Sequence, residues 1–227
     1  MSESVTLQSL PDNNSVLISP NLPLLSPCKT AESPPLQLGV MASGSGTNFE
    51  AVAKAIADKQ LNAQIKVLIY NNPRAKVKER AEKYHIPAVL VDHRKYRQRE
   101  DLDRQIITVM QSYGVDWVIM AGWMRIMTQV LLDAYQDRTI NIHPSLLPSF
   151  KGINAIEQAL AAKVKITGCT VHLVSLEVDS GTILMQAAVP ILPGDNLTAL
   201  HQRIQIQEHR IFPQAIALAA KLALDKK

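Results

Sequence analysis

Asn141 and His143 stand two residues apart at the end of an apolar stretch and could stabilise a developing negative charge. Residues 139–143 predict a β-strand, on which side chains two positions apart point to the same side. Pro144 ends this strand, so the pair lies near its carboxyl end, where open α/β sheets bind ligands. An amide beside an imidazole suits an oxyanion on a carbonyl under attack. The alternative is a histidine that is merely hydrogen-bonded in a strand-to-loop turn.

Asp179 is the third candidate, in the connection 176–181 between two apolar segments. A carboxylate near His143 would favour the imidazolium and could relay protons. The alternative is an aspartate that stabilises its own turn. No nucleophile is indicated, because Ser145 lacks a nucleophile-elbow pattern.

A metal site is not predicted. His172, His201 and His209 do not combine with His143 at a spacing that zinc ligands use. The two cysteines, Cys28 and Cys169, have no partners at zinc-finger spacing and are too few for a disulfide framework. We therefore expect a reducing compartment, the cytoplasm.

The turn at residues 44–48, Gly-Ser-Gly-Thr-Asn, lies between a predicted strand and a predicted helix. Backbone N–H groups at a helix N-terminus attract phosphate, and glycine lets the backbone approach it closely. A dinucleotide site would need a third glycine where Phe49 stands and an acid near residues 70–72, which are Tyr-Asn-Asn. One phosphomonoester fits better. The alternative is a capped turn, since Ser43, Thr47 and Asn48 are all common N-cap residues.

The elements that must position these residues alternate between strand and helix patterns, which predicts an α/β Rossmann-like open sheet, mainly parallel, with helices on both faces. The last two strands are joined directly, so we expect an antiparallel C-terminal strand. Predicted strands cover residues 36–42, 64–70, 88–91, 117–121, 139–143, 170–174 and 182–189. Predicted helices cover residues 49–59, 75–84, 98–113, 129–135, 155–162 and 197–223. The last is predicted as one helix, which Pro213 could bend.

Composition limits the class of protein. The 227 residues carry a net charge of +4, with 47% hydrophobic residues, as in an ordinary globular protein. No apolar run approaches the roughly 20 residues of a membrane-spanning helix. The mixed charges of residues 94–104, Asp103 among them, indicate a solvated helix face rather than a nucleic-acid surface. Residues 1–35 hold six of the 13 prolines and seven serines, which predicts a disordered tail before a domain at 36–227.

Residues 141–148, Asn-Ile-His-Pro-Ser-Leu-Leu-Pro, followed by Gly152, resemble the signature of the folate-dependent formyltransferases. Further matches follow in the expected order, and the resemblance extends from residue 36 to about residue 220. These matches are residues 43–48, 121–127, 178–181 and 205–209. The resemblance is greatest to the single-domain members that act in purine synthesis. It implies transfer of a formyl group from 10-formyltetrahydrofolate, as co-substrate, to the amine of glycinamide ribonucleotide, without a metal or a covalent enzyme adduct.

The same resemblance implies the roles of individual residues. Asn141, His143 and Asp179 match the catalytic positions. Gly46, Thr47 and Asn48 match the phosphate loop, and Glu208 matches a carboxylate that receives the ribose hydroxyls. The folate-binding positions match Arg99, Met124, Arg125, Ile126, Met127, Asn141, Ser175, Leu176, Glu177, Val178 and Asp179. Without the resemblance, Glu208 would be interpreted as a surface charge, and Met124 and Met127 as core residues.

One position departs from the family pattern, since Asn154 stands where some members have a histidine. An asparagine donates hydrogen bonds but carries no charge, so a pH-dependent role there is in doubt. The alternatives are a formyltetrahydrofolate deformylase, which would have a further N-terminal domain, a methionyl-tRNA formyltransferase, which would have a further C-terminal domain, and a binding-only protein. We expect small-molecule partners, no nucleic acid or membrane, and a monomer or weak homodimer.

Overall fold

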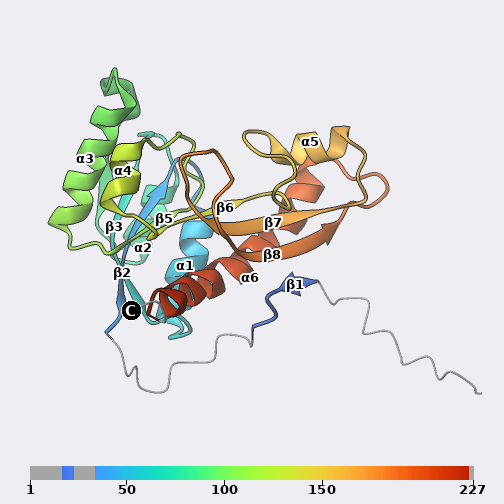
Figure 1. Cartoon of the computed structure of the whole chain (residues 1–227), viewed down its shortest axis with the longest axis horizontal. Coiled ribbons are helices and arrows are strands. Elements are labelled where there is room, and N and C mark those ends of the chain that lie inside the picture. The colour runs from blue at the N-terminus through green and yellow to red at the C-terminus, as the bar shows by residue number, and fades with distance from the viewer. Residues whose placement is uncertain (1–16, 23–33, 225–227) are drawn as a thin grey trace, which may run out of the picture.

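A computed structural model describes residues 17–22 and 34–224 of the chain, which form a single twisted sheet of eight strands covered by helices (Figure 1). The strand order is β1-β8-β7-β6-β5-β2-β3-β4. The strands are β1 (Ile18–Ser19), β2 (Leu36–Ala42), β3 (Ala63–Tyr70), β4 (Ala88–Leu90), β5 (Trp117–Met120), β6 (Thr139–His143), β7 (Ile166–Leu173) and β8 (Ile183–Pro190). The helices are α1 (Thr47–Ala57), α2 (Val77–Lys83), α3 (Arg99–Ser112), α4 (Gln129–Ala134), α5 (Ala155–Ala161) and α6 (Leu197–Leu224), with a 3₁₀ turn at His93–Lys95.

The parallel part of the sheet is formed by β4, β3, β2, β5 and β6. β7 runs antiparallel to both β6 and β8, which confirms the predicted mixed sheet. Parallel strands need a crossover on one face of the sheet, and the helices between them supply it. The switch in direction occurs at β6, the strand that carries Asn141 and His143. The antiparallel pair β7–β8 therefore begins directly beside these residues.

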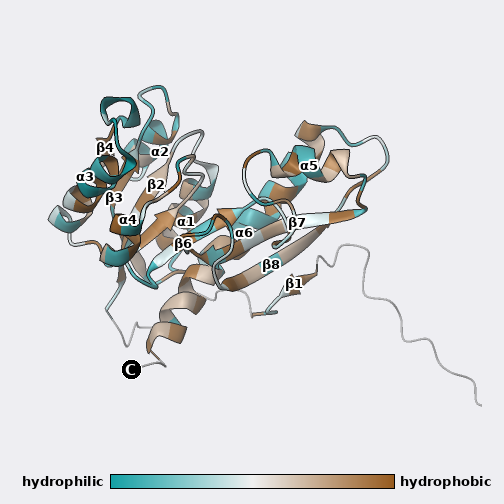
Figure 2. Cartoon of the chain, turned by 45° about the horizontal axis from the view of Figure 1, so that its top comes forward, coloured by the Kyte–Doolittle hydropathy of each residue, from teal (hydrophilic) through white to brown (hydrophobic). Residues whose placement is uncertain are grey.

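Two hydrophobic cores lie on opposite faces of the sheet (Figures 1 and 2). One core packs α1, α2 and α6 against the strands, with Phe49 and Phe212 fully buried. The other packs α3 and α4, with Ile106 and Leu131 fully buried. Both faces of the central strands are covered, which explains their continuous apolar sequences. Figure 2 shows brown stretches along the central strands and a mixture of teal and brown residues along the helices that cover them.

Some expectations need correction. The predicted tail, residues 1–35, lies largely outside the described residues. Within it, Ile18 and Ser19 pair antiparallel with Ala187 and Gln186 of β8, because an open sheet edge offers unpaired backbone groups to any extended segment. β7 also begins four residues before the predicted start at residue 170, since Gly168 packs against β8 as part of the strand.

α6 continues through Pro213 as one helix, as predicted, because its buried apolar side chains hold both halves against the sheet. Asp103 is 2% exposed on the inner side of α3, so the prediction of a fully solvated face at residues 94–104 is wrong at this position. Among the described residues, every helix is too short or too polar to cross a lipid bilayer.

Candidate active site

A cleft of about 600 Å³ opens at the carboxyl ends of the parallel strands. Its walls come from the turn after β2, the segment after β5, the end of β6, the loop before α5, the β7–β8 connection and one face of α6. The cleft therefore lies at the place where the sheet changes from parallel to antiparallel, as expected for a ligand site in an open α/β sheet. Asn141, His143 and Asp179 all line it.

The three predicted catalytic residues meet in the middle of this cleft. Asn141 and His143 alternate with Ile142 on β6, so both face the cleft while Ile142 is buried in the sheet core. Asp179, on the connection between β7 and β8, places Oδ2 3.3 Å from Nδ1 of His143. The side chains of His143 and Asp179 are 6% and 10% exposed, so their interaction is only weakly screened by water. The structure thus brings together three residues that are up to 38 positions apart in the chain.

Asp179 is held in a strained turn. Its φ of 50° lies in the left-handed region, which is uncommon for a residue other than glycine. Gly181 follows, where a Cβ atom would lie 1.7 Å from the carbonyl oxygen of Leu173, so only glycine fits. Strain of this kind persists only where the surroundings determine the conformation. The turn therefore fixes the direction of the Asp179 carboxylate.

Opposing influences set the charge state of Asp179. Burial acts to raise its pKa, but contacts with His172, with the backbone N–H of Gly152 and with His143 outweigh that effect, so the pKa lies below its ordinary value. The Gly152 N–H donates to Oδ2 at 2.8 Å. Asp179 is therefore ionised at neutral pH and presents a negative charge to His143.

His143 uses both ring nitrogens. Nε2 lies 2.8 Å from the carbonyl oxygen of Phe150, which can only accept a hydrogen bond. Nδ1 faces the ionised carboxylate of Asp179. Both ring nitrogens of His143 therefore face acceptor atoms of the protein, which fixes the orientation of the ring in the cleft.

His172 is a member of this group that the sequence analysis considered only as a metal ligand. It is directly opposite Asn141 in the β6–β7 pairing. Its Nδ1 lies 2.8 Å from the carbonyl oxygen of Leu173, and its Nε2 lies 3.2 Å from Nδ2 of Asn141 and 3.7 Å from Oδ1 of Asp179. Nε2 of His172 therefore lies between the amide of Asn141 and the carboxylate of Asp179 and contacts both. Only the register between two strands 31 residues apart places it there, so no local pattern signals its role.

The glycine turn forms one end of the cleft. Gly46 is the N-cap of α1 with φ of 75°, and α1 has no side-chain cap. The alternative of a turn capped by Ser43, Thr47 or Asn48 is therefore wrong. A Cβ on Gly46 would meet Val77 at 2.3 Å, so glycine is required for both its φ and its fit. The N–H groups of the first turn of α1 remain available to an anion.

Side chains from α6 complete this end. Nδ2 of Asn48 donates to Oε2 of Glu208 at 3.0 Å, and Nε2 of Gln205 donates to Oγ1 of Thr47 at 2.9 Å. Burial raises the pKa of Glu208, although Asn48 opposes this. Glu208 is 5% exposed, so the alternative of a surface charge is wrong. Gln205 lines the cleft beside it and was absent from the predicted site residues.

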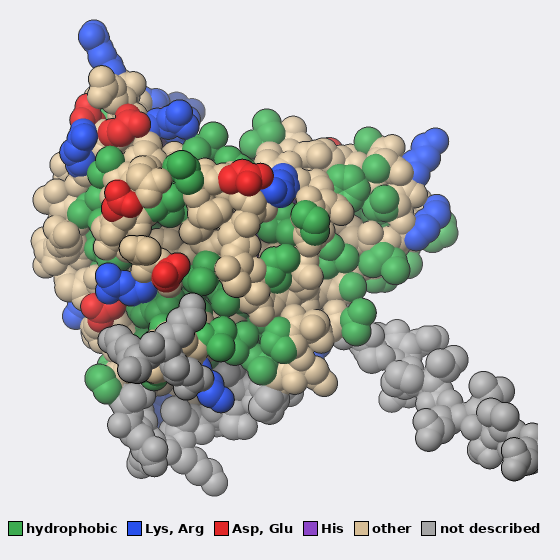
Figure 3. Space-filling model, viewed as in Figure 1, with side chains coloured by type: hydrophobic (Ala, Val, Ile, Leu, Met, Phe, Trp, Pro, Cys, Tyr) green, Lys and Arg blue, Asp and Glu red, His purple; other side chains and the backbone are tan. Residues whose placement is uncertain are grey.

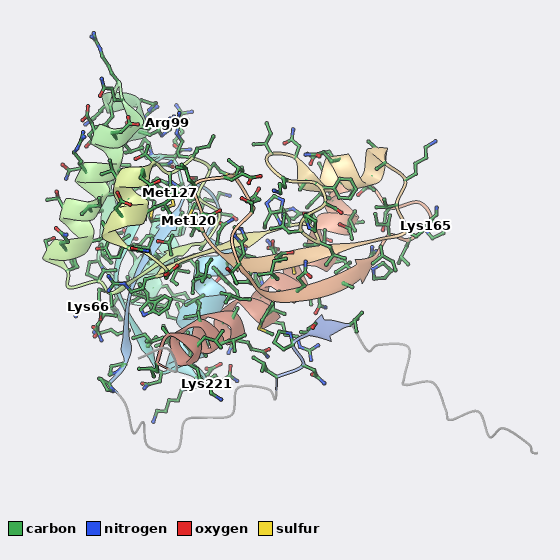
Figure 4. All side chains as sticks on the ribbon, viewed as in Figure 1. Lys66, Arg99, Met120, Met127, Lys165 and Lys221 are labelled. Carbon is green, nitrogen blue, oxygen red and sulfur yellow. The ribbon has the colours of Figure 1, made fainter. Side chains whose placement is uncertain are left out.

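The other end of the cleft is apolar. Met124 and Ile126, in the irregular segment 121–128 between β5 and α4, are 71% and 53% exposed, and Leu176 and Val178 across the cleft are 59% and 42% exposed. Exposed apolar side chains that face each other across a cleft are typical of a ligand site. Met127 is buried in the core behind the segment (Figure 4). Arg125 and Ser175 also line the cleft.

Two predicted folate-binding residues do not line the cleft. Glu177 points away and forms an ion pair with Lys151 at 3.0 Å, on the rim. Arg99 is exposed at the first turn of α3, on the same side of the molecule as Met127 (Figure 4). Asn154, the residue that departs from the family pattern, lines the cleft as the N-cap of α5 with φ of 58°.

The chain was compared with known proteins. A family model described as formyl transferase matches residues 36–216. The phosphoribosylglycinamide formyltransferase of Bacillus subtilis is 40% identical over 180 residues, 79% of this chain and 92% of that protein. The human trifunctional purine biosynthetic protein adenosine-3 is 40% identical over 184 residues, 81% of this chain. This chain spans 18% of the length of that trifunctional protein.

Solved structures give the same result. A glycinamide ribonucleotide transformylase from Symbiobacterium toebii aligns with a TM-score of 0.79 at 42% identity, over 80% of this chain and 86% of that one. A phosphoribosylglycinamide formyltransferase from Bacillus halodurans aligns with a TM-score of 0.78 at 41% identity, over 82% of this chain and 95% of that one. The family match over residues 36–216 includes every residue that lines the cleft.

Proposed function

The chain belongs to the formyl transferase family, and from this premise we propose that it transfers the formyl group of 10-formyltetrahydrofolate to the amine of 5-phosphoribosylglycinamide, in purine biosynthesis. We assign this activity to the domain at residues 36–227. The observation that carries the proposal is the position of Asn141, His143 and Asp179 between an anion-binding turn and an apolar wall in one cleft. A phosphorylated amine and a flat aromatic folate would thus meet at the three polar side chains.

The reaction needs a stabilised oxyanion. The substrate amine attacks the formyl carbon, a new C–N bond forms, and the carbonyl oxygen takes the negative charge. Nδ2 of Asn141 has one N–H near His172 and a second that can donate to this oxygen. The imidazolium of His143 adds a positive charge beside it. Preorganised groups of this kind act strongly in a site from which water is excluded.

Proton transfer completes the reaction. The attacking nitrogen loses a proton, the folate N10 gains one, and the C–N10 bond breaks to release tetrahydrofolate. Asp179, ionised and held by Gly152, keeps His143 charged and orients the water through which the proton passes. No step of this scheme uses a metal or a covalent enzyme adduct.

Binding divides between the ends of the cleft. Gly46, Thr47 and Asn48 receive the phosphate at the start of α1, and Glu208 receives the ribose hydroxyls. The apolar side chains of residues 124–127 and 175–178 pack against the pteridine, and backbone groups of the same segments bind its polar edge. Arg99 lies outside the cleft, where a basic residue suits the glutamate tail of the folate.

The partners are these two small molecules. Figure 3 shows Lys and Arg side chains scattered among Asp and Glu on the face in view, without a continuous basic stripe of the kind that nucleic acid requires. We propose a monomer or weak homodimer that acts in the cytoplasm, where both substrates are dissolved.

One assay tests the proposal. Purified protein is mixed with 10-formyltetrahydrofolate, and tetrahydrofolate release is followed with and without glycinamide ribonucleotide. We expect release only when the nucleotide is present. Release without it would instead identify a formyltetrahydrofolate deformylase, and no release in either case would contradict both. Asp133→Asn, on the exposed side of α4, is the matched control for Asp179→Asn in the same assay.

A further inference from the structure

The apolar wall formed by residues 124–127 lacks regular secondary structure, and polar side chains hold it at both ends. At the first end, the N–H of Met124 donates to Oγ of Ser43 at 2.9 Å. At the second end, the N–H of Thr128 donates to Oδ2 of Asp103 at 2.7 Å. Backbone groups in an irregular segment need such partners when they are buried. The position of the wall therefore depends on two side chains that come from other elements.

Of these two side chains, Ser43 and Asp103, Asp103 is the one whose burial is unusual for its type. It lies on the inner side of α3 between Leu102 and Ile106, and it is 2% exposed. An apolar side chain would pack there at lower cost, because a buried carboxylate loses its hydration. Burial raises the pKa of Asp103, although the N–H of Thr128 opposes this effect. A carboxyl group at such a position needs a reason, and its hydrogen bond to the end of the wall supplies one.

We propose that Asp103 is a positioning residue for the folate end of the cleft, which fixes residues 124–127 by accepting the hydrogen bond from Thr128. This inference rests on the proposed function, because it takes the ligand of this wall to be the folate. Asp103 does not itself line the cleft, so it acts through the backbone of the wall. Ser43 holds the opposite end of the wall in the same way, from the turn after β2.

α3 also connects this contact to Arg99. The two residues are four positions apart, one helical turn, and the charge of Arg99 acts on the carboxyl group of Asp103. A shift of α3 would therefore move Arg99 and release the wall together. One helix therefore positions both the apolar wall and Arg99, the predicted contact to the glutamate tail, although Arg99 and the wall are about 25 residues apart in the sequence.

The test compares Asp103→Ala with Asp103→Asn. Asparagine keeps an acceptor oxygen for the Thr128 N–H, whereas alanine does not. Binding of 10-formyltetrahydrofolate is measured without nucleotide through tryptophan fluorescence, to which Trp123, the residue before the wall and one that lines the cleft, contributes together with the buried Trp117. We expect Asp103→Ala to weaken folate binding at least ten-fold and to shift the tryptophan emission to longer wavelength. Asp103→Asn should stay within three-fold of wild type, and KM for glycinamide ribonucleotide should change by less than two-fold in both variants.

The control is Asp101→Ala, an exposed carboxylate on the same helix that pairs with Arg104. Equal losses for alanine and asparagine at position 103, or an equal rise in KM for both substrates, would overturn the inference. If Asp103→Ala does not fold, Ser43→Ala removes the other attachment and should weaken folate binding with the same selectivity; unchanged folate binding would then overturn it. Failure of the wild-type protein to bind 10-formyltetrahydrofolate would contradict the proposed function instead.

Discussion

The two ends of the cleft are built from different kinds of groups. At the end proposed to bind the nucleotide, called the nucleotide end, a glycine turn, the first turn of α1 and the buried Glu208 on α6 hold polar groups in fixed directions. α2 braces this turn, because Nε of Arg80 donates to the carbonyl oxygen of Ser45 at 2.8 Å. At the folate end, exposed methionine, leucine and isoleucine side chains extend from loops.

This difference predicts how the binding free energy is divided between the two proposed substrates. Directed hydrogen bonds to a charged or hydroxylated ligand give strong discrimination, since an unsatisfied buried group is costly. Apolar contacts add affinity in small steps and tolerate changes in ligand shape. We therefore expect substitutions of the side chains that contact a ligand directly to be severe at the nucleotide end and mild at the folate end. Substitutions of the residues between the two ends should act mainly on turnover.

The largest effect is expected at the junction of the two ends. Asp179→Asn removes the charge that faces His143, and we expect kcat to fall by about 10²–10³, comparable to loss of an oxyanion-hole donor. Affinity for glycinamide ribonucleotide should remain within about three-fold, since the nucleotide end is not altered. Steady-state kinetics with each substrate varied in turn would check this. A variant with near-normal turnover would contradict the mechanism.

At the nucleotide end, Glu208→Gln removes a charged acceptor from the predicted ribose site. A hydrogen bond to a charged group contributes roughly 1.5–3 kcal/mol, so KM for glycinamide ribonucleotide should rise about 10- to 100-fold. KM for 10-formyltetrahydrofolate should stay unchanged. A parallel rise in both KM values would show that the two ends are not independent.

The same substitution should weaken substrate binding but increase the free energy of unfolding at neutral pH. Burial raises the pKa of Glu208 above 4.5, so the folded protein retains this proton as pH rises while the unfolded chain loses it. Wild type therefore loses stability as pH rises from about 4.5 to the folded-state pKa, and Glu208→Gln does not. We expect the melting temperature of the variant to exceed that of wild type at pH 7, by about 2–4 °C for each kcal/mol of added unfolding free energy. At pH 4 the two melting temperatures should be equal. Thermal unfolding at the two pH values would decide, and a lower melting temperature at pH 7 would refute the explanation.

The smallest effect is expected at the folate end. Met124→Ala truncates a side chain that is 71% exposed, so the protein should unfold at the same temperature as wild type. KM for 10-formyltetrahydrofolate should rise only about two- to five-fold, in keeping with partial loss of one apolar contact. A loss as large as that of Glu208→Gln would remove the distinction between the two ends.

The sequence alone was sufficient where the signal is local. Asn141 and His143 share a face because of strand alternation, and the parallel elements follow from apolar periodicity. The sequence was insufficient where a contact depends on how two distant segments pack together. The contact between His172 and Asn141 depends on strand register, and the burial of Asp103 within a charged helix depends on what packs against α3. Arg99 was named from the resemblance, and its place outside the cleft emerges only from the orientation of α3.

The short strand β1 has a practical consequence for anyone who trims this protein. A chain that begins at Leu36 retains every residue of the cleft but loses the backbone partner of β8, including the carbonyl of Leu17 that accepts from the N–H of Ala188 at 2.9 Å. The outer side of β8 would then present unpaired backbone groups to its neighbours in a concentrated solution. We expect such a shortened protein to self-associate more readily at high concentration, so residues 17–22 belong in any sample prepared for crystals.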